Sequence, residues 1–211
     1  MTPIYLLYSD EANAQENFNR LVKIAPYAEA IKSVGSIFKS HKYIADLCIA
    51  DRFYVVDGDC WIVDGFKFDD NIELKEKSVA VFRAKNPING LVYGHGGIKL
   101  FSKDCFGPDR LESSDMTTSL AESYIVINIL ASEHRFNYSE FSTWRTAARE
   151  SAKLISGTIK NQVSKETNDR LNVWLTVGKD KPYGSFCLDR SEEHTSELQS
   201  LRHLVCRLLL E

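Results

Sequence analysis

The chain has 211 residues, of which 44% are hydrophobic, and its 26 basic and 29 acidic residues give a net charge of −3. That length suffices for one domain with a sizeable core. The weakly acidic balance excludes the basic footprint by which proteins bind nucleic acid or anionic membranes. The sequence also contains no run of about 18 apolar residues that would span a bilayer. We therefore expect neither nucleic acid nor a membrane among the partners.

Short apolar runs alternate with amphipathic segments in the first 57 residues. In chain order they predict a strand at 4–8, a helix at 13–24, a strand at 28–34, a helix at 36–50 and a strand at 53–56. Ser36 is suited to capping the second helix. The run at 53–56 is apolar throughout, which is typical of a strand buried on both faces. This alternation predicts an α/β fold with a mostly parallel central sheet and flanking helices.

Beyond residue 57 the apolar runs become shorter and predict strands at 61–63, 79–82, 98–101 and 124–130. Gly94, Gly96 and Gly97 mark a backbone that is bent, crowded or close to a ligand. A helical period returns at 141–162 and at 166–177, which predicts two C-terminal helices. No internal repeat or low-complexity linker interrupts the chain, so we expect a single domain over residues 1–189.

The last 22 residues resemble a translated DNA-sequencing adapter. Residues 190–200 and 204–211 match its two constant blocks, and 201–203 fit its variable index. We therefore expect a non-native tail at 190–211, with the native sequence cut near Asp189. Without the three basic and four acidic residues of the tail, 23 basic and 25 acidic residues remain, a net charge of −2. The remaining cysteines form no CxxC pair, which predicts reduced thiols in a cytoplasmic protein.

Two aspartates, Asp57 and Asp59, flank Gly58 directly after the apolar run at 53–56. In a parallel α/β sheet, ligands bind outside the carboxyl ends of the strands. Two carboxylates at that edge suit a hard divalent cation, which in turn bridges phosphate oxygens. Most Asp-x-Asp tripeptides are ordinary surface turns. The apolar strand that precedes this one is what favours a metal site over a surface turn.

This arrangement resembles the nucleotide-sugar glycosyltransferases of the GT-A fold. In that family a helix leads into an apolar strand that ends in an Asp-x-Asp metal site, as residues 44–59 do here. Gly96 and Gly97 are similar to the glycine pair that lines the donor and acceptor site in several branches. Asp115, within 113–119, is similar to the acidic segment that supplies the catalytic base in inverting members. The chain also resembles proteins of tailed-phage genomes, for which the expected location is the host cytoplasm.

The resemblance implies transfer of a sugar from a nucleotide-sugar donor to a glycan or another hydroxyl acceptor. Mn²⁺ or Mg²⁺ on Asp57 and Asp59 would stabilise the charge on the departing diphosphate. His134 follows a strand end, where the family's late metal ligand lies. Asp115 would deprotonate the acceptor hydroxyl. The remaining candidates for contacts to the substrate are Ser9 and Asp10, for the nucleoside, and Lys42, for ribose or phosphate.

Each of these residues also has a structural reading. Asp115 fits a helix N-cap, and Gly96 with Gly97 fits a tight turn. Ser9 and Asp10 fit an ordinary polar turn, and Lys42 fits a solvated helix face. His134 fits an ordinary histidine of the core or the surface. Two other functions also stay open. One is a Mg²⁺-dependent phosphoryl-transfer or nuclease domain that uses Asp64 or Asp115 as a further metal ligand. The other is a non-catalytic sugar-binding or interaction domain of the same fold.

Overall fold

The computed structural model describes residues 1–107, 120–156 and 163–187. Their contacts form two compact units. The first comprises Met1–Asn86 and Val92–Arg135, and the second comprises Pro87–Leu91 and the described residues from Phe136 onward. The single domain over residues 1–189 stays a prediction. The non-native tail also stays a prediction, because 188–211 lie outside the described residues. No helix of the described residues is long and apolar enough to cross a membrane.

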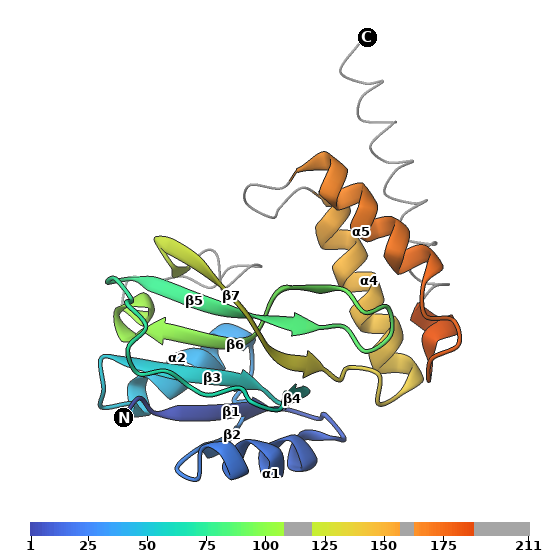
Figure 1. Ribbon diagram of the computed structural model, residues 1–211. Coiled ribbons are helices and arrows are strands. Elements are labelled where there is room, and N and C mark those ends of the chain that lie inside the picture. Colours follow the sequence, from blue (N-terminus) through green and yellow to red (C-terminus); the bar gives the residue numbers. More distant parts are fainter. Residues whose placement is uncertain (108–119, 157–162, 188–211) are drawn as a thin grey trace. The chain divides into compact units, whose positions relative to one another are not determined.

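The first unit is built on a seven-stranded sheet in the order β2-β1-β3-β6-β5-β7-β4 (Figure 1). Its strands are β1 (Ile4–Tyr8), β2 (Glu29–Lys32), β3 (Arg52–Asp57), β4 (Cys60–Ile62), β5 (Ser78–Lys85), β6 (Val92–Ser102) and β7 (Ser123–His134). The described residues of this unit also form two helices, α1 (Ala14–Ile24) and α2 (Ile37–Leu47), and the short 3-10 helix η1 (Lys103–Phe106). As predicted, Ser36 caps α2, and its side chain accepts a hydrogen bond from the Lys39 amide at 3.3 Å.

The α/β class with flanking helices is confirmed, but the sheet is mixed rather than purely parallel. β1, β2, β3, β5 and β7 run in one direction, whereas β4 and β6 run against them. Six residues separate β5 from β6, and two separate β3 from β4. A parallel crossover needs a dozen residues or more, so these short connections force a reversal of chain direction. Because β1, β3 and β7 run in the same direction, their carboxyl ends lie at one edge of the sheet.

β3 is buried on both faces, as its continuous apolar sequence predicted. Tyr54 and Val56 pack with α1 in one core cluster, while Phe53 and Val55 pack with α2 in the other. All four side chains are fully buried. Because successive side chains alternate between the faces of a sheet, Asp57 continues the α2-facing row. The sheet thus places an aspartate at the end of its third strand, with core on both sides.

The second unit contains α4 (Glu140–Ser156) and α5 (Ser164–Thr176), the two predicted C-terminal helices. They pack around an apolar cluster that includes Phe136, Leu154 and Trp174. The segment 157–162, which the sequence assigns to the first of these helices, lies outside the described residues.

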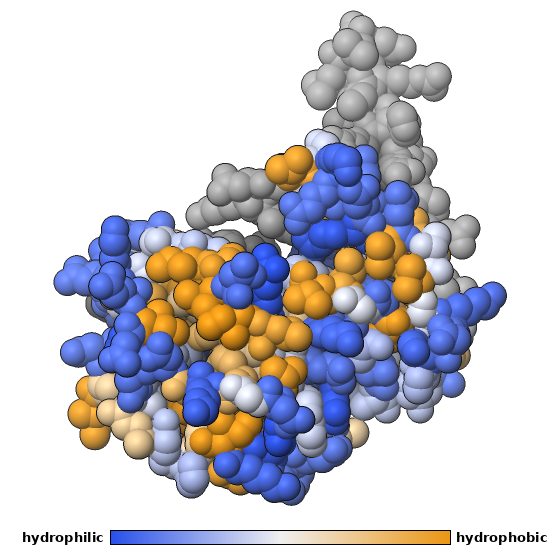
Figure 2. Space-filling view, viewed as in Figure 1, coloured by the Kyte–Doolittle hydropathy of each residue, from blue (hydrophilic) through white to orange (hydrophobic). Residues whose placement is uncertain are grey.

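Apolar side chains gather on part of the surface of the first unit (Figure 2). They lie where Figure 1 shows β5 and β7. The exposed large hydrophobic residues of β7 are Tyr124, Val126, Ile129 and Leu130. The charged and polar side chains described next lie elsewhere, at the ends of β1, β3 and β7.

Candidate functional site

The turn Asp57–Gly58–Asp59 connects β3 to β4 at the edge where the strand ends meet. A Cβ atom on Gly58 would lie 2.8 Å from the Cβ of Tyr8 and 3.1 Å from Oε2 of Glu11. Real side chains do not tolerate such contacts, so glycine is required here for the turn to lie against the end of β1. Close packing between two strand ends therefore explains why a glycine separates the two aspartates.

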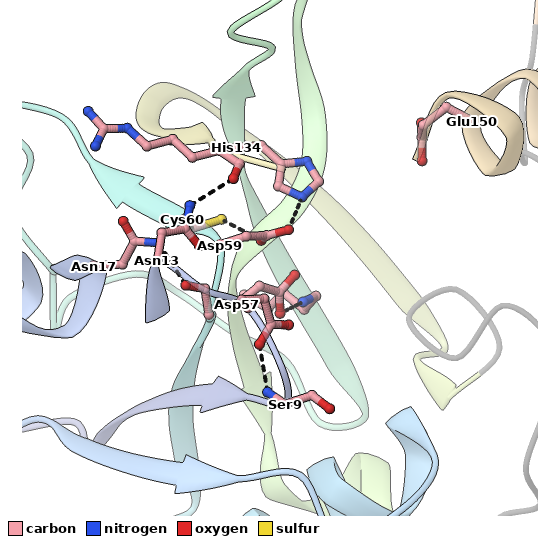
Figure 3. A network of polar contacts seen from close by, with 12 residues as sticks. Ser9, Asn13, Asn17, Asp57, Asp59, Cys60, His134 and Glu150 are labelled. Atoms are coloured by element: carbon pink, nitrogen blue, oxygen red, sulfur yellow. Dashed lines mark hydrogen bonds and ion pairs between the residues drawn. The ribbon is translucent and has the colours of Figure 1, made fainter. Parts of the chain in front are cut away.

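Two asparagines, one at the N-cap of α1 and one a turn further along the helix, hold this turn from the other side (Figure 3). Nδ2 of the buried Asn17 donates to the Gly58 carbonyl at 2.7 Å. Nδ2 of Asn13 donates to the Arg135 carbonyl at 2.8 Å, and the Arg135 amide donates to the Asp59 carbonyl at 2.7 Å. Sequence reasoning missed both asparagines. Their signal was position, because Asn17 occupies the core-facing row of α1 together with Leu21.

Asp57 is paired with a buried lysine. Oδ1 of Asp57 lies 2.7 Å from Nζ of Lys99 on β6. The lysine side chain is 8% exposed and the aspartate side chain 37% exposed. An ammonium in such a buried place needs a counterion, and Asp57 supplies it. Lys99 was also missed from the sequence, although it is a single lysine within the apolar run 98–101.

Asp59 is paired with the predicted metal ligand His134. Oδ2 of Asp59 lies 2.7 Å from Nε2 of His134, and the two side chains point toward one another in Figure 3. Both are largely buried, at 18% and 8% exposed. The two residues are 75 positions apart in sequence and meet because β7 ends beside β4. Since Asp59 and His134 orient each other, His134 is placed to fix the aspartate whether or not it contacts a cation itself.

The thiol of Cys60 lies next to Asp59, with Sγ 4.0 Å from Oδ1. Burial raises the pKa of Cys60 well above its ordinary value, and the carboxylates of Asp59 and Asp57 raise it further. The thiol is therefore protonated at neutral pH. Its role is packing against the backbone of Gly97, as described below.

Glu11 adds a third carboxyl group at this edge. Its Oε2 accepts a hydrogen bond from the Ser9 amide at 2.6 Å. Burial raises the pKa of Glu11, and the charges of Asp59 and Asp10 raise it further. Ser9 and Asp10 themselves lie on the exposed turn after β1. Acidic groups from two strand ends thus gather at one place, where they favour a cation.

The glycine pair lies at the same edge. A Cβ on Gly97 would lie 2.3 Å from Sγ of Cys60, so β6 approaches β4 more closely than any other residue would permit. Gly96 has a φ of +73°, and its Cβ position is 3.3 Å from Cε of Lys99. The structure therefore brings Gly96 and Gly97 to the Asp57–Asp59 turn, and their packing accounts for both glycines without a ligand.

One of the predicted residues, Lys42, is not brought to this turn. The ammonium of Lys42 pairs with Asp46 one turn along the exposed face of α2, at 3.1 Å. Asp115 falls in 108–119, outside the described residues. Asp64, the further ligand of the phosphoryl-transfer alternative, is exposed and pairs with Arg20.

The donor set suits a cation whose coordination a ligand completes. Among the described residues, no group of three or more His, Cys, Asp or Glu side chains is arranged to hold a metal ion. Mg²⁺ is commonly bound by one or two carboxylates together with substrate phosphates and water. Asp57 and Asp59 are two such carboxylates on one rigid turn. They fit a divalent cation shared with a phosphate ligand, and they do not form a closed protein cage.

Comparison with known proteins gives no family. No protein-family model matches the sequence, and no curated protein is similar to it. Among solved structures, HddC from Yersinia pseudotuberculosis has a TM-score of 0.41 and 14% identity, covering 62% of this chain and 71% of that one. A glycosyltransferase involved in glycosylation of the major capsid of PBCV-1 has a TM-score of 0.37 and 11% identity, covering 60% and 82%. The glycosyltransferase GlyE of Streptococcus pneumoniae TIGR4 has a TM-score of 0.39 and 12% identity, covering 61% and 46%. Scores this low carry no argument, so any function has to be argued from the site itself.

Proposed function

We propose that the first unit is a glycosyltransferase that binds a nucleotide-sugar donor at the Asp57–Asp59 turn. The supporting observation is the turn itself, which follows the central buried strand and is held by α1 and by β7. It presents two carboxylates at the edge where α/β sheets bind ligands. A divalent cation, Mn²⁺ or Mg²⁺, held there would stabilise the negative charge on the diphosphate as it leaves.

The charge at this edge supports a requirement for the cation. Burial raises the pKa of Glu11, and the negative charges of Asp59 and Asp10 raise it further, while Lys99 supplies one positive charge to Asp57. A bare diphosphate would meet mainly repulsion at such an edge. A divalent cation reverses the sign of this interaction, so we expect donor binding to depend on the metal.

The remaining roles follow from the resemblance and from position. The donor's nucleoside would lie near Ser9 and Asp10, which directly follow β1 at the same edge. The acceptor would be a glycan or another hydroxyl compound. In an inverting reaction, Asp115 would take the proton of the acceptor hydroxyl.

Thermal denaturation with a panel of nucleoside diphosphates and nucleotide sugars, each with and without Mn²⁺, tests the proposal. A ligand stabilises the fold by RT ln(1 + [L]/Kd), about 2.7 kcal/mol at a hundredfold excess over Kd. We expect at least one nucleotide to raise the melting temperature when Mn²⁺ is present and much less without it. Donor hydrolysis then separates an enzyme from a sugar-binding domain. Absence of any nucleotide-dependent shift with Mn²⁺ would contradict the proposal.

A further inference from the structure

Lys99 is a buried ammonium with hydrogen-bonding capacity to spare. Its residue exposure is 6%, and among the described residues its one hydrogen-bond acceptor is Oδ1 of Asp57, at 2.7 Å. A lysine ammonium has three N–H donors. Two of them are therefore left for oxygen atoms that the described side chains do not provide. Buried polar groups are nearly always hydrogen-bonded, so these donors indicate a ligand or water oxygen beside Asp57.

The neighbours of Lys99 show that its charge is held in place. Lys99 lies on the α2-facing side of β6, and its Cε is 3.3 Å from the Cβ position of Gly96. Any side chain at residue 96 would press on that stem. The stem is thus confined between the backbone of β6 and the core beneath α2.

The buried histidine of α2, His41, does not supply a second positive charge. Burial lowers the pKa of His41 to about 3, and the positive charge of Lys99 contributes to this shift. The ring of His41 is neutral at physiological pH, with Nδ1 2.8 Å from the Ile37 carbonyl oxygen. His41 therefore adds no positive charge to that of Lys99.

We infer that Lys99 is a direct phosphate ligand that shares Asp57 with the divalent cation. This inference rests on the proposed function. Without ligands, the ammonium neutralises Asp57 and so weakens the attraction of this carboxylate for a cation. When a diphosphate binds, the spare N–H donors of Lys99 reach a phosphate oxygen, and cation and ammonium neutralise the ligand together.

Two binding measurements with opposite expected signs follow from this arrangement. Replacement of Lys99 by methionine removes the charge that competes for Asp57, so Mn²⁺ alone should bind about tenfold more tightly. The same replacement removes a charged hydrogen bond to phosphate, so inorganic pyrophosphate at saturating Mn²⁺ should bind about tenfold more weakly. Damage to the fold would weaken the binding of both Mn²⁺ and pyrophosphate. A purely structural role of Lys99 would leave both affinities unchanged.

The experiment compares the parent chain, Lys99→Met and Lys99→Gln by isothermal titration with Mn²⁺ and then with pyrophosphate. Glutamine keeps a hydrogen-bond donor for Asp57 but not the charge, so Lys99→Gln carries the test if the methionine variant does not fold. Lys165→Met is the matched control, because Lys165 forms an exposed pair with Asp169 at 2.8 Å in the second unit. It should bind both probes as the parent does.

Opposite shifts for the two probes support the inference. Equal weakening of both, or no change in either, overturns it while the parent still binds pyrophosphate with Mn²⁺. If the parent itself binds neither pyrophosphate nor any nucleotide with Mn²⁺, the proposed function fails as well. The behaviour of the parent thus distinguishes the two failures.

Discussion

Replacement of Asn17 by leucine should loosen the Asp57–Asp59 turn at a calculable cost. Leucine has the branched shape of asparagine, although it is larger, and it has no polar atom, so the Gly58 carbonyl loses the donor that lies 2.7 Å away. An unpaired buried carbonyl costs about 1–3 kcal/mol. Oδ1 of Asn17 is itself buried without a hydrogen-bond partner among the described residues, and its removal offsets part of this cost. We expect a net loss of about 1–2 kcal/mol in the free energy of unfolding.

Urea denaturation of Asn17→Leu and of the control Asn19→Leu measures this loss, as a lower midpoint at an unchanged m-value. Asn19 lies on the exposed face of α1, so its replacement should change the unfolding free energy by less than about 0.5 kcal/mol. Mn²⁺ affinity should fall in Asn17→Leu and stay at the parental value in the control. If Asn17→Leu matches the control in both stability and Mn²⁺ affinity, Asn17 does not hold the turn.

Three further results are expected. Gly97→Ala should cost about 1–3 kcal/mol through overpacking against Cys60, and the double variant with Cys60→Ala should recover part of it; additive losses would refute the contact. Glu11→Gln should remove a pH dependence of stability. Folding raises the pKa of Glu11, so the parent protein loses stability as the pH rises from the unfolded pKa through the folded pKa of this group. The variant should therefore be as stable as the parent in acid and more stable at pH 7, as urea denaturation at the two pH values would show. Asparagine caps a helix about as well as aspartate but cannot take up a proton, so in Asp115→Asn turnover should fall by a factor of about 10² to 10⁴ with little change in melting temperature. Retention of more than about a tenth of the rate would exclude Asp115 as the base.

The sequence was sufficient for those parts of the fold that depend on local pattern. The continuous apolar run at 53–56 predicted a doubly buried strand, and Phe53 to Val56 are fully buried. Strand direction depends instead on pairing between distant segments. The apolar run at 98–101 has the same composition in either direction, so the reversal of β6 was visible only in its short connection to β5.

The sequence singled out Asp57, Asp59 and His134, whereas Lys99 and Asn17, which contact the same turn, were missed. Asp57 and Asp59 are adjacent in sequence to the strand that positions them. Lys99 alternates with Ile98 and Leu100, a pattern that equally fits a lysine facing water at a half-buried strand. This lysine is buried because that face of the sheet is covered by a second core cluster, to which α2 contributes. Asn17 was missed for a similar reason, because its acceptor on Gly58 is 41 residues away.

Binding of nucleoside diphosphates to Asp59→Asn addresses the proposed metal site directly. The asparagine oxygen can still accept a hydrogen bond from His134, so the variant should keep the melting temperature of the parent within a few degrees. Asp64→Asn, at an exposed carboxylate paired with Arg20, is the control. Calorimetric titration with Mn²⁺ present should show nucleotide binding to the parent and to Asp64→Asn, and none to Asp59→Asn. If Asp59→Asn binds the nucleotide with the parental affinity and the same dependence on Mn²⁺, the turn at Asp57–Asp59 is not the metal site.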